Sequence, residues 1–421
     1  MGLTLAEKIF LRHSSKKRLE DFIYARVDFA FANDVTGPLT VKQFYKITDK
    51  KVFNPKKIAF VCDHFTPAKD LSSANNVALL REFSLKFKIP NFFDINHCGI
   101  EHVFLAEQGF IKPGGLVIGA DSHTCTFGAL GALGLGVGST DLASAFATGK
   151  CWFRVPKSLK FIYKGRLSKW VFAKDLILYT ISKIGVDGAL YEVMEFSGEV
   201  IRRMEMDGRF TICNMAIEAG AKTGIIEPDE KTFRYLRRVS PLRIKDLKSD
   251  KNARYEKVYE WDVSKLQPQV ASPHLPSNVK SVGELKSVKL NQVVIGSCTN
   301  GRISDLRIAA KILKNRKVKS NLRVIIIPAT PNIYKQALRE GLINVFINAG
   351  CLVSPPTCGP CLGGHMGILG EEEVALATTN RNFVGRMGHP KSFVYLASPA
   401  VAAASAVKGR IAHPEEVYKV V

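Results

Sequence analysis

The chain has 421 residues, of which 46% are hydrophobic and 23% are charged. These proportions are typical of globular proteins and argue against a disordered or membrane-resident chain, and the length predicts two or three domains. The formal net charge of +22 is compatible with nucleic acid, an anionic substrate or an acidic partner chain, and by itself it selects none of them.

The sequence predicts a cytoplasmic protein without a membrane span. Residues 1–8 lack the basic region and uninterrupted apolar run of a secretory signal. The most apolar stretch, residues 127–137, is interrupted by glycines and is too short to cross a bilayer. In such a protein the nine cysteines are expected to be reduced, and to serve packing, metal binding or catalysis.

Short apolar runs rich in β-branched residues predict buried strands along the whole chain. These runs are residues 58–62, 116–120, 293–296, 324–328 and 393–397. Helical periodicity predicts helices at residues 142–151, 304–313, 333–338 and 400–407. This alternation predicts an α/β protein with parallel sheets covered by helices.

Polar clusters directly follow three of the predicted strands. Asp63 and His64 follow the first, residues 121–123 (Asp-Ser-His) follow the second, and residues 297–300 (Ser-Cys-Thr-Asn) follow the third. Because ligands of open α/β sheets bind beyond the carboxyl ends of strands, these clusters predict one site. A lysine- and proline-rich stretch at 241–285 and a weaker break near Pro156 predict three domains, 1–155, 156–284 and 285–421.

Cys298 and the pair Cys358 and Cys361 supply three thiolates. A Cys-x-x-Cys pair is also found in redox dithiols and in zinc sites, and His365 could complete a Cys3His zinc set. The redox reading is disfavoured because the pair follows the proline-rich segment 354–356 instead of opening a helix. On a four-iron cluster, three cysteines would leave one iron open for Lewis-acid chemistry.

Several motifs occur in the order that is found in the aconitase family. They are residues 33–38 (Asn-Asp-Val-Thr-Gly-Pro), 62–64 (Cys-Asp-His), 119–124 (Gly-Ala-Asp-Ser-His-Thr), 213–221, 296–302, 358–361 (Cys-Gly-Pro-Cys) and 380–386. On these motifs the chain resembles the aconitase family over nearly its whole length, and most closely the large subunits of isopropylmalate isomerases and homoaconitases. A proline stands where single-chain aconitases carry a substrate-binding glutamine in the segment 34–38, so citrate is a less favoured substrate.

The resemblance implies three aconitase-like α/β domains around a cluster-bearing crevice, without the family's mobile fourth domain. It implies one [4Fe-4S] cluster per chain on Cys298, Cys358 and Cys361, whose open iron binds the hydroxyl and one carboxylate of the substrate. The fourth domain, with a catalytic base, is expected on a separate small subunit. The expected reaction is isomerisation of a 2-hydroxy polycarboxylic acid by dehydration and rehydration, with 2-isopropylmalate favoured over homocitrate derivatives.

The resemblance also implies roles for the polar residues. His64, paired with Asp63, would protonate the departing hydroxyl. Further implied catalytic residues are Asp121, His123 and the pair His102 and Glu218; implied substrate contacts are Arg381, Arg386 and Ser122; and the implied amides near the cluster and active site are Asn214 and Asn380.

Simpler explanations exist for these residues one by one. Asp121 could cap the helix that follows it, the Asn214–Glu218 spacing could form a solvated helix face, and both arginines could lie on the surface. The other cysteines (62, 98, 125, 151, 213 and 351) are expected to be buried small side chains. The histidines at 13, 274, 365, 389 and 413 are expected to be structural or to lie on the surface. A cluster-sensing RNA-binding protein is the alternative of another class. A protein that only binds RNA would not need an intact set of acid-base residues, so nucleic acid is not the expected partner.

Overall fold

The computed structural model describes residues 2–95, 97–237, 239 and 247–418. The chain forms two compact units, the first comprising Met1–Lys164 and Ala189–Trp261 and the second Gly165–Gly188 and Asp262–Val421. The expected break near Pro156 lies inside the first unit, and the division into three domains stays a prediction. No helix of the described part combines the length and the apolar character needed to cross a membrane.

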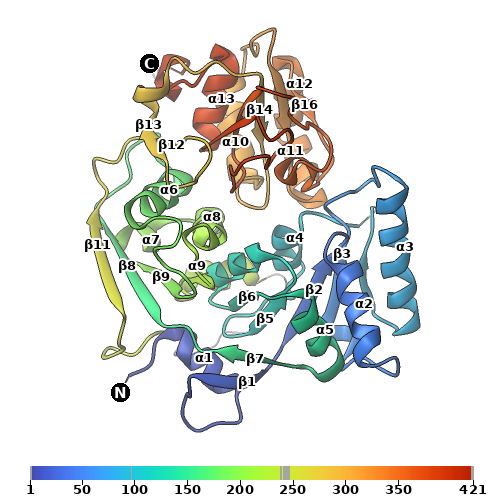
Figure 1. Ribbon diagram of the computed structural model, residues 1–421. Helices are drawn as coiled ribbons and strands as arrows, with labels where there is room; N and C mark the ends of the chain where they lie inside the picture. Colours follow the sequence, from blue (N-terminus) through green and yellow to red (C-terminus); the bar gives the residue numbers. More distant parts are fainter. Residues whose placement is uncertain (1, 96, 238, 240–246, 419–421) are drawn as a thin grey trace. The chain divides into compact units, whose positions relative to one another are not determined.

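The first unit is built on a five-stranded sheet in which all strands are parallel (Figure 1). Its order is β4 (Asn91–Phe93), β3 (Ile58–Val61), β2 (Phe29–Asn33), β5 (Leu116–Gly119) and β6 (Leu133–Gly136). A four-stranded sheet has the order β10 (Thr223–Ile225), β9 (Val193–Ser197), β8 (Ser158–Lys164) and β11 (Lys257–Asp262), and an antiparallel pair joins β1 (Phe22–Arg26) to β7 (Lys150–Arg154). The central strands β2, β3 and β5 are fully buried, as their apolar sequences require.

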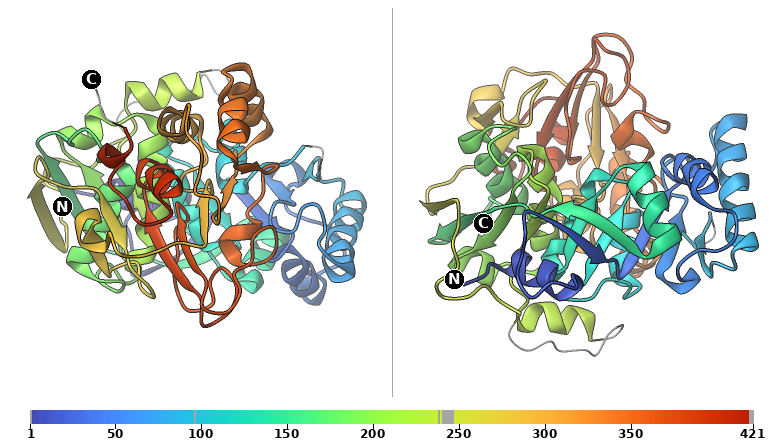
Figure 2. Two further views of the ribbon diagram at one scale, coloured as in Figure 1. Left: turned by 90° about the horizontal axis from the view of Figure 1, so that it is seen from above. Right: turned by 60° about the horizontal axis from the view of Figure 1, so that its bottom comes forward.

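Helices cover these sheets, and α2 packs against both α3 and α5 (Figures 1 and 2). The helices of this unit are α1 (Leu5–His13), α2 (Gly37–Ile47), α3 (Leu71–Lys86), α4 (Glu101–Glu107), α5 (Ser139–Thr148), α7 (Glu199–Arg203), α8 (Met206–Asn214) and α9 (Glu230–Leu236), with 3-10 turns η1 (Pro55–Lys57), η2 (Ser122–Leu130) and η3 (Met215–Ala219). A capping box between Thr4 and Glu7 starts α1.

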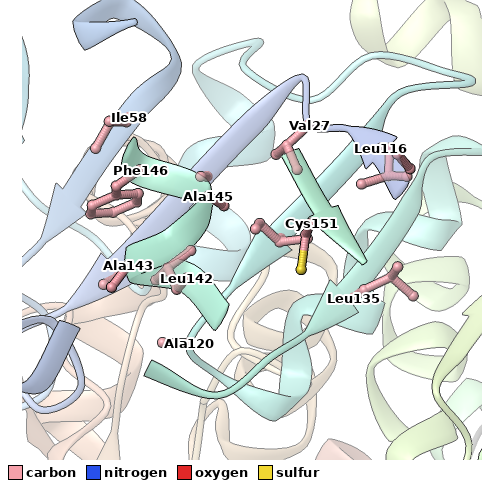
Figure 3. Packing of buried hydrophobic residues seen from close by; sticks show 14 of the residues in the cluster. Val27, Ile58, Leu116, Ala120, Leu135, Leu142, Ala143, Ala145, Phe146 and Cys151 are labelled. Carbon is pink, nitrogen blue, oxygen red and sulfur yellow. The ribbon is translucent and has the colours of Figure 1, made fainter. Parts of the chain in front are cut away.

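The helix expected at 142–151 ends earlier than its apolar pattern suggested. Gly149 adopts a left-handed conformation with φ of 72° and closes α5. Cys151 therefore lies in β7, and its side chain belongs to the same buried core cluster as Phe146 and Leu142 of α5 (Figure 3). The prediction was wrong at this end because an apolar run does not distinguish a last helical turn from a buried strand.

The second unit is built on a seven-stranded sheet. Its order is β13 (Val279–Ser281), β12 (Gln269–Ala271), β18 (Phe393–Ala397), β17 (Val374–Ala377), β14 (Gln292–Ile295), β15 (Arg323–Ile326) and β16 (Leu352–Val353). The strands from β18 to β16 are parallel, whereas β12 is antiparallel to both of its neighbours.

Its helices are α6 (Ala173–Ile184), α10 (Ile303–Leu313), α11 (Pro331–Arg339), α12 (Leu342–Ala349) and α13 (Pro399–Lys408), with η4 (Val282–Leu285), η5 (Gly359–Leu362) and η6 (Pro414–Glu416). Helix α10 packs against both α12 and α13 (Figure 1). The expected α/β class is confirmed, and the five predicted strands and three of the four predicted helices match observed elements to within a few residues. Residues 241–246 of the expected domain junction lie outside the described residues.

Candidate active site

Three strand ends gather acidic and histidine side chains in the first unit. Strands β2, β3 and β5 are adjacent and parallel, so their carboxyl ends lie at one edge of the sheet. Asp34 follows β2, Asp63 and His64 follow β3 by two and three residues, and Asp121 follows β5. This arrangement places the polar clusters of the first unit where a ligand binds in parallel sheets.

His64 and Asp63 form a buried dyad. His64 Nδ1 lies 2.7 Å from Asp63 Oδ1, and Asp63 Oδ2 accepts the backbone N–H of Glu101 at 2.7 Å. Burial by itself lowers the pKa of His64, but the charge and hydrogen bond of Asp63 outweigh it and hold that pKa well above its ordinary value. His64 is therefore suited to keep a proton at neutral pH, which is what a general acid requires.

Asp34 fixes the backbone of this dyad, and the sequence reasoning did not single it out. Its Oδ1 accepts the backbone N–H of His64 at 2.9 Å, and its Oδ2 accepts that of Phe65 at 2.7 Å. Asp34 is 1% exposed. Its position directly after a buried strand, like that of Asp63 and Asp121, was the available indication.

We expect Asp34→Ala to destabilise the first unit by about 3 kcal/mol, because one buried and one partly buried N–H group would lose a carboxylate acceptor. Chemical denaturation followed by circular dichroism should show a lower midpoint. The exposed Asp49 offers a matched control, and Asp49→Ala should change the free energy of unfolding by no more than about 0.5 kcal/mol. Equal midpoints for the two variants would contradict the role given to Asp34.

Asp121 lies between two histidines. Its Oδ1 is 3.6 Å from His102 Nε2 and 3.4 Å from His123 Nδ1. Burial opposes ionisation of Asp121, but the hydrogen bond of His123 and the charges of both histidines hold its pKa well below its ordinary value. Asp121 also accepts the N–H of His123 and caps η2, so the capping explanation describes part of its role.

Glu218 contacts His123, and the pair of Glu218 with His102 that the resemblance implied stays a prediction. Glu218 Oε1 lies 2.9 Å from His123 Nε2, and both side chains are buried. Asn214 is also buried and donates to Thr126 Oγ1 at 2.8 Å. The alternative of a solvated helix face at 214–218 is therefore wrong. Ser122, the implied substrate contact in this unit, is half-buried beside Asp121.

Glu101 is a second residue that the sequence reasoning missed. It begins α4 directly before His102, and its carboxyl is fully buried. Burial, together with the nearby charges of Asp63 and Asp121, raises the pKa of Glu101 well above its ordinary value. Its Oε1 accepts from Asn33 Nδ2 at 2.9 Å, and polar atoms of His64, Glu101 and Asp121 all lie within 4.8 Å of one another. These three groups therefore form one largely buried cluster of ionisable side chains.

Three loops bring sulfur and amide groups together in the second unit. They follow the carboxyl ends of β14, β16 and β17, which belong to one parallel set of strands. The first loop carries Cys298, the second carries Cys358 and Cys361, and the third carries Asn380, Arg381 and Arg386. The cysteines are 3%, 8% and 3% exposed, respectively.

Asn380 joins two of these loops through sulfur contacts. Its Nδ2 donates to Cys298 Sγ at 3.3 Å, and its Oδ1 accepts from Cys361 Sγ at 3.5 Å. Arg386 Nη2 lies 3.7 Å from the same Cys361 Sγ, and Arg302 Nη1 donates to the carbonyl of Cys298 at 2.9 Å. Cationic and amide donors around sulfur stabilise thiolates, so this donor set fits an iron–sulfur cluster.

His365, the candidate fourth zinc ligand, packs against the loop that carries Cys358 and Cys361. Its Nε2 lies 3.3 Å from Thr357 Oγ1. A Cβ atom on Gly359 would lie 2.2 Å from the ring of His365, so the ring packs directly on the backbone between Cys358 and Cys361. This packing explains His365 as a structural residue, and it explains why glycine occupies position 359.

The remaining cysteines and histidines have structural surroundings. Cys62, Cys98, Cys125, Cys151, Cys213 and Cys351 are all buried, as expected. His13 Nε2 lies 2.6 Å from Asp28 Oδ2, and His413 caps η6. Arg381, predicted to be a substrate contact, is half-buried directly after Asn380.

A family model for aconitases, described as aconitate hydratase, matches residues 7–287 and 278–409 of this chain. The chain belongs to the aconitase family. Membership of this family implies an iron–sulfur cluster, for which the second unit offers the three buried cysteines.

Curated members of the family resemble the chain over its whole length. A protein of Thermodesulfovibrio yellowstonii, named 3-isopropylmalate dehydratase large subunit, is 60% identical over 99% of this chain and 100% of the relative. The Pyrococcus furiosus protein named 3-isopropylmalate dehydratase large subunit 1 is 58% identical, with the same two coverages. The 3-isopropylmalate dehydratase large subunit of Aquifex aeolicus is 57% identical over 100% of this chain and 98% of its own length. Among solved structures, holo aconitase X of Thermococcus kodakaraensis has a TM-score of 0.49 and 12% identity, covering 91% of this chain and 94% of that chain.

Proposed function

We propose that this chain is the large catalytic subunit of a 3-isopropylmalate dehydratase, a hydro-lyase of leucine biosynthesis. It would convert 2-isopropylmalate to 3-isopropylmalate by removing water and adding it back. The observation that supports this most strongly is the sequence identity of 57–60% to curated proteins named as such large subunits, over nearly the full chain. The buried acid-base groups and the buried cysteines are the side chains that such a reaction needs.

We propose one [4Fe-4S] cluster per chain, held by Cys298, Cys358 and Cys361. When bound, the cluster supplies a Lewis acid at the iron that lacks a protein ligand. Asn380 supports this assignment because its amide contacts the sulfurs of Cys298 and Cys361 from one side chain. Arg381 and Arg386 would bind substrate carboxylates, since a guanidinium group can donate two parallel hydrogen bonds to a carboxylate.

The proton chemistry is assigned to the first unit. Because Nδ1 of His64 is hydrogen-bonded to Asp63, His64 would deliver the proton on Nε2 to the departing hydroxyl. His102, Asp121, His123 and Glu218 would hold the neighbouring proton network in place, with Ser122 as a substrate contact and Asn214 as a nearby amide. Glu101 joins this set, because its raised pKa favours the protonated carboxyl beside His64 and Asp121.

The curated relatives are named large subunits, so we propose that activity requires a small subunit. That subunit would supply the fourth domain of the family, the base that removes the proton from the neighbouring carbon, and the wall around the variable side chain of the substrate. We also propose that the assembly works in the cytoplasm, where the nine cysteines of this chain, which form no disulfide among the described residues, would stay reduced.

An assay of separated and mixed subunits tests this function. Cluster-loaded chain alone should not turn over 2-isopropylmalate, and activity should appear when the candidate small subunit is added. Homocitrate derivatives should be poor substrates for the same mixture. Full turnover by the isolated chain would exclude the two-subunit mechanism, and a preference for homocitrate derivatives would reassign the enzyme to lysine biosynthesis.

A further inference from the structure

Lys174 is a fully buried lysine in the second unit. It lies in the first turn of α6, its exposed fraction is 0%, and it is among the largest fully buried side chains of the described residues. Burying an ammonium group is costly unless hydrogen bonds and negative charge compensate for the lost water. A lysine buried in this way therefore requires compensating acceptors around its ammonium group.

The ammonium group contacts the backbone at the start of the loop that follows β17 and carries Asn380. Lys174 Nζ donates to the carbonyl of Thr378 at 3.0 Å and to that of Thr379. Thr378 and Thr379 directly precede Asn380, whose amide contacts the sulfurs of Cys298 and Cys361.

Thr378 also connects this point to the loop that carries Cys298. Its Oγ1 accepts the backbone N–H of Gly296 at 2.9 Å, and its own N–H donates to Val294 at 3.0 Å. Lys174 therefore supports, through Thr378, the backbone that leads into both the Cys298 loop and Asn380.

The start of α6 is itself held firmly, which fixes the direction of Lys174. The neighbouring Asp175 accepts the backbone N–H of Phe172 and that of Gln269, each at 2.8 Å. Gln269 begins β12, so the first helical turn is tied to the seven-stranded sheet. An ammonium group on a fixed turn provides a fixed positive charge.

We propose that Lys174 is a positioning residue for the iron–sulfur cluster. Its ammonium group fixes residues 378–380 so that Asn380 reaches the sulfurs, and its charge stabilises the cluster-bound, thiolate form of the site relative to the empty form. The inference rests on the proposed function, because it requires the cluster on Cys298, Cys358 and Cys361. It adds a residue from α6, far from these cysteines in the sequence, to the groups that retain the cluster.

The test compares Lys174→Met and Lys174→Gln with a matched control. Lys222 is a partly buried lysine of the first unit that donates to the carbonyl of Gly136 at 2.6 Å, and Lys222→Met removes it in the same way. Each protein is reconstituted anaerobically, its iron and sulfide are measured, and the loss of visible absorbance is followed after adding an iron chelator. We expect both Lys174 variants to lose the cluster about 10- to 100-fold faster than the parent, and Lys222→Met to match the parent.

Melting of the cluster-free proteins separates this role from a purely structural one. Cluster-free Lys174→Gln should fold and melt near the cluster-free parent because its amide can still donate, whereas cluster-free Lys174→Met should fold but melt at a lower temperature because the carbonyls of Thr378 and Thr379 lose their donor. Cluster-free variants that fail to fold, or a parent-like rate of cluster loss in either Lys174 variant, would overturn the inference. A parent protein that binds no iron and sulfide would instead refute the proposed function.

Discussion

Cys358→Ser is expected to abolish both the cluster and turnover. A serine hydroxyl is a harder ligand than a thiolate and stays protonated at neutral pH, so it does not replace sulfur on iron. Cys298→Ser and Cys361→Ser should have the same effect, because each removes one of the three sulfurs proposed to hold the cluster. Iron and sulfide analysis, visible absorbance and turnover with the small subunit would all fall to background.

The other cysteines provide the control for this experiment. Cys351 is buried, and burial raises the pKa of its thiol to about 12, as expected for a packed thiol. Cys351→Ser should keep the iron, and so should Cys151→Ser in the core of the first unit. If Cys351→Ser and Cys151→Ser lost the visible absorbance of the cluster while the other three replacements kept it, the assignment of the ligands would be wrong. Protein that contained stoichiometric zinc and no iron would exclude the iron–sulfur cluster.

His64→Ala is expected to lower turnover by about 100-fold or more while the iron content stays unchanged. The imidazole belongs to the first unit, whereas the three cysteines belong to the second, so its removal should affect proton transfer and not cluster retention. His97 is an exposed histidine of the same unit, and His97→Ala should behave like the parent. Near-normal turnover by a cluster-loaded His64→Ala protein would exclude His64 as the acid.

The pH profile gives a second measurement of the same role. Because the pKa of His64 is raised, its acid form persists through neutral pH, and the dehydration rate should fall only as the pH rises through that elevated pKa. Asp63→Asn removes the charge that raises the pKa, so the alkaline limb of the profile should move to lower pH. An unchanged alkaline limb in Asp63→Asn would show that another group limits the rate.

Local patterns were sufficient for the strands and for the residues that follow them. The buried strands are short, continuous apolar runs. A polar residue that follows a parallel strand lies at the edge of the sheet where ligands bind, so its position is predictable from the sequence. This is why Asp63, His64, Asp121 and Cys298 were found from the sequence. The end of α5 was not, because Gly149 terminates the helix through its backbone conformation while the apolar pattern continues into β7.

The sequence by itself determined the α/β class, the polar clusters after the strands and the resemblance to the aconitase family. Only the tertiary structure decided which of these groups touch each other. Glu218 contacts His123, Asp34 holds the backbone of His64, and Lys174 reaches the loop of Asn380. These contacts join residues far apart in the chain. Burial and nearby carboxylates raise the pKa of Glu101, and the charge and hydrogen bond of Asp63 raise that of His64 against the effect of burial. Folding brings these groups together, and no local sequence pattern records it.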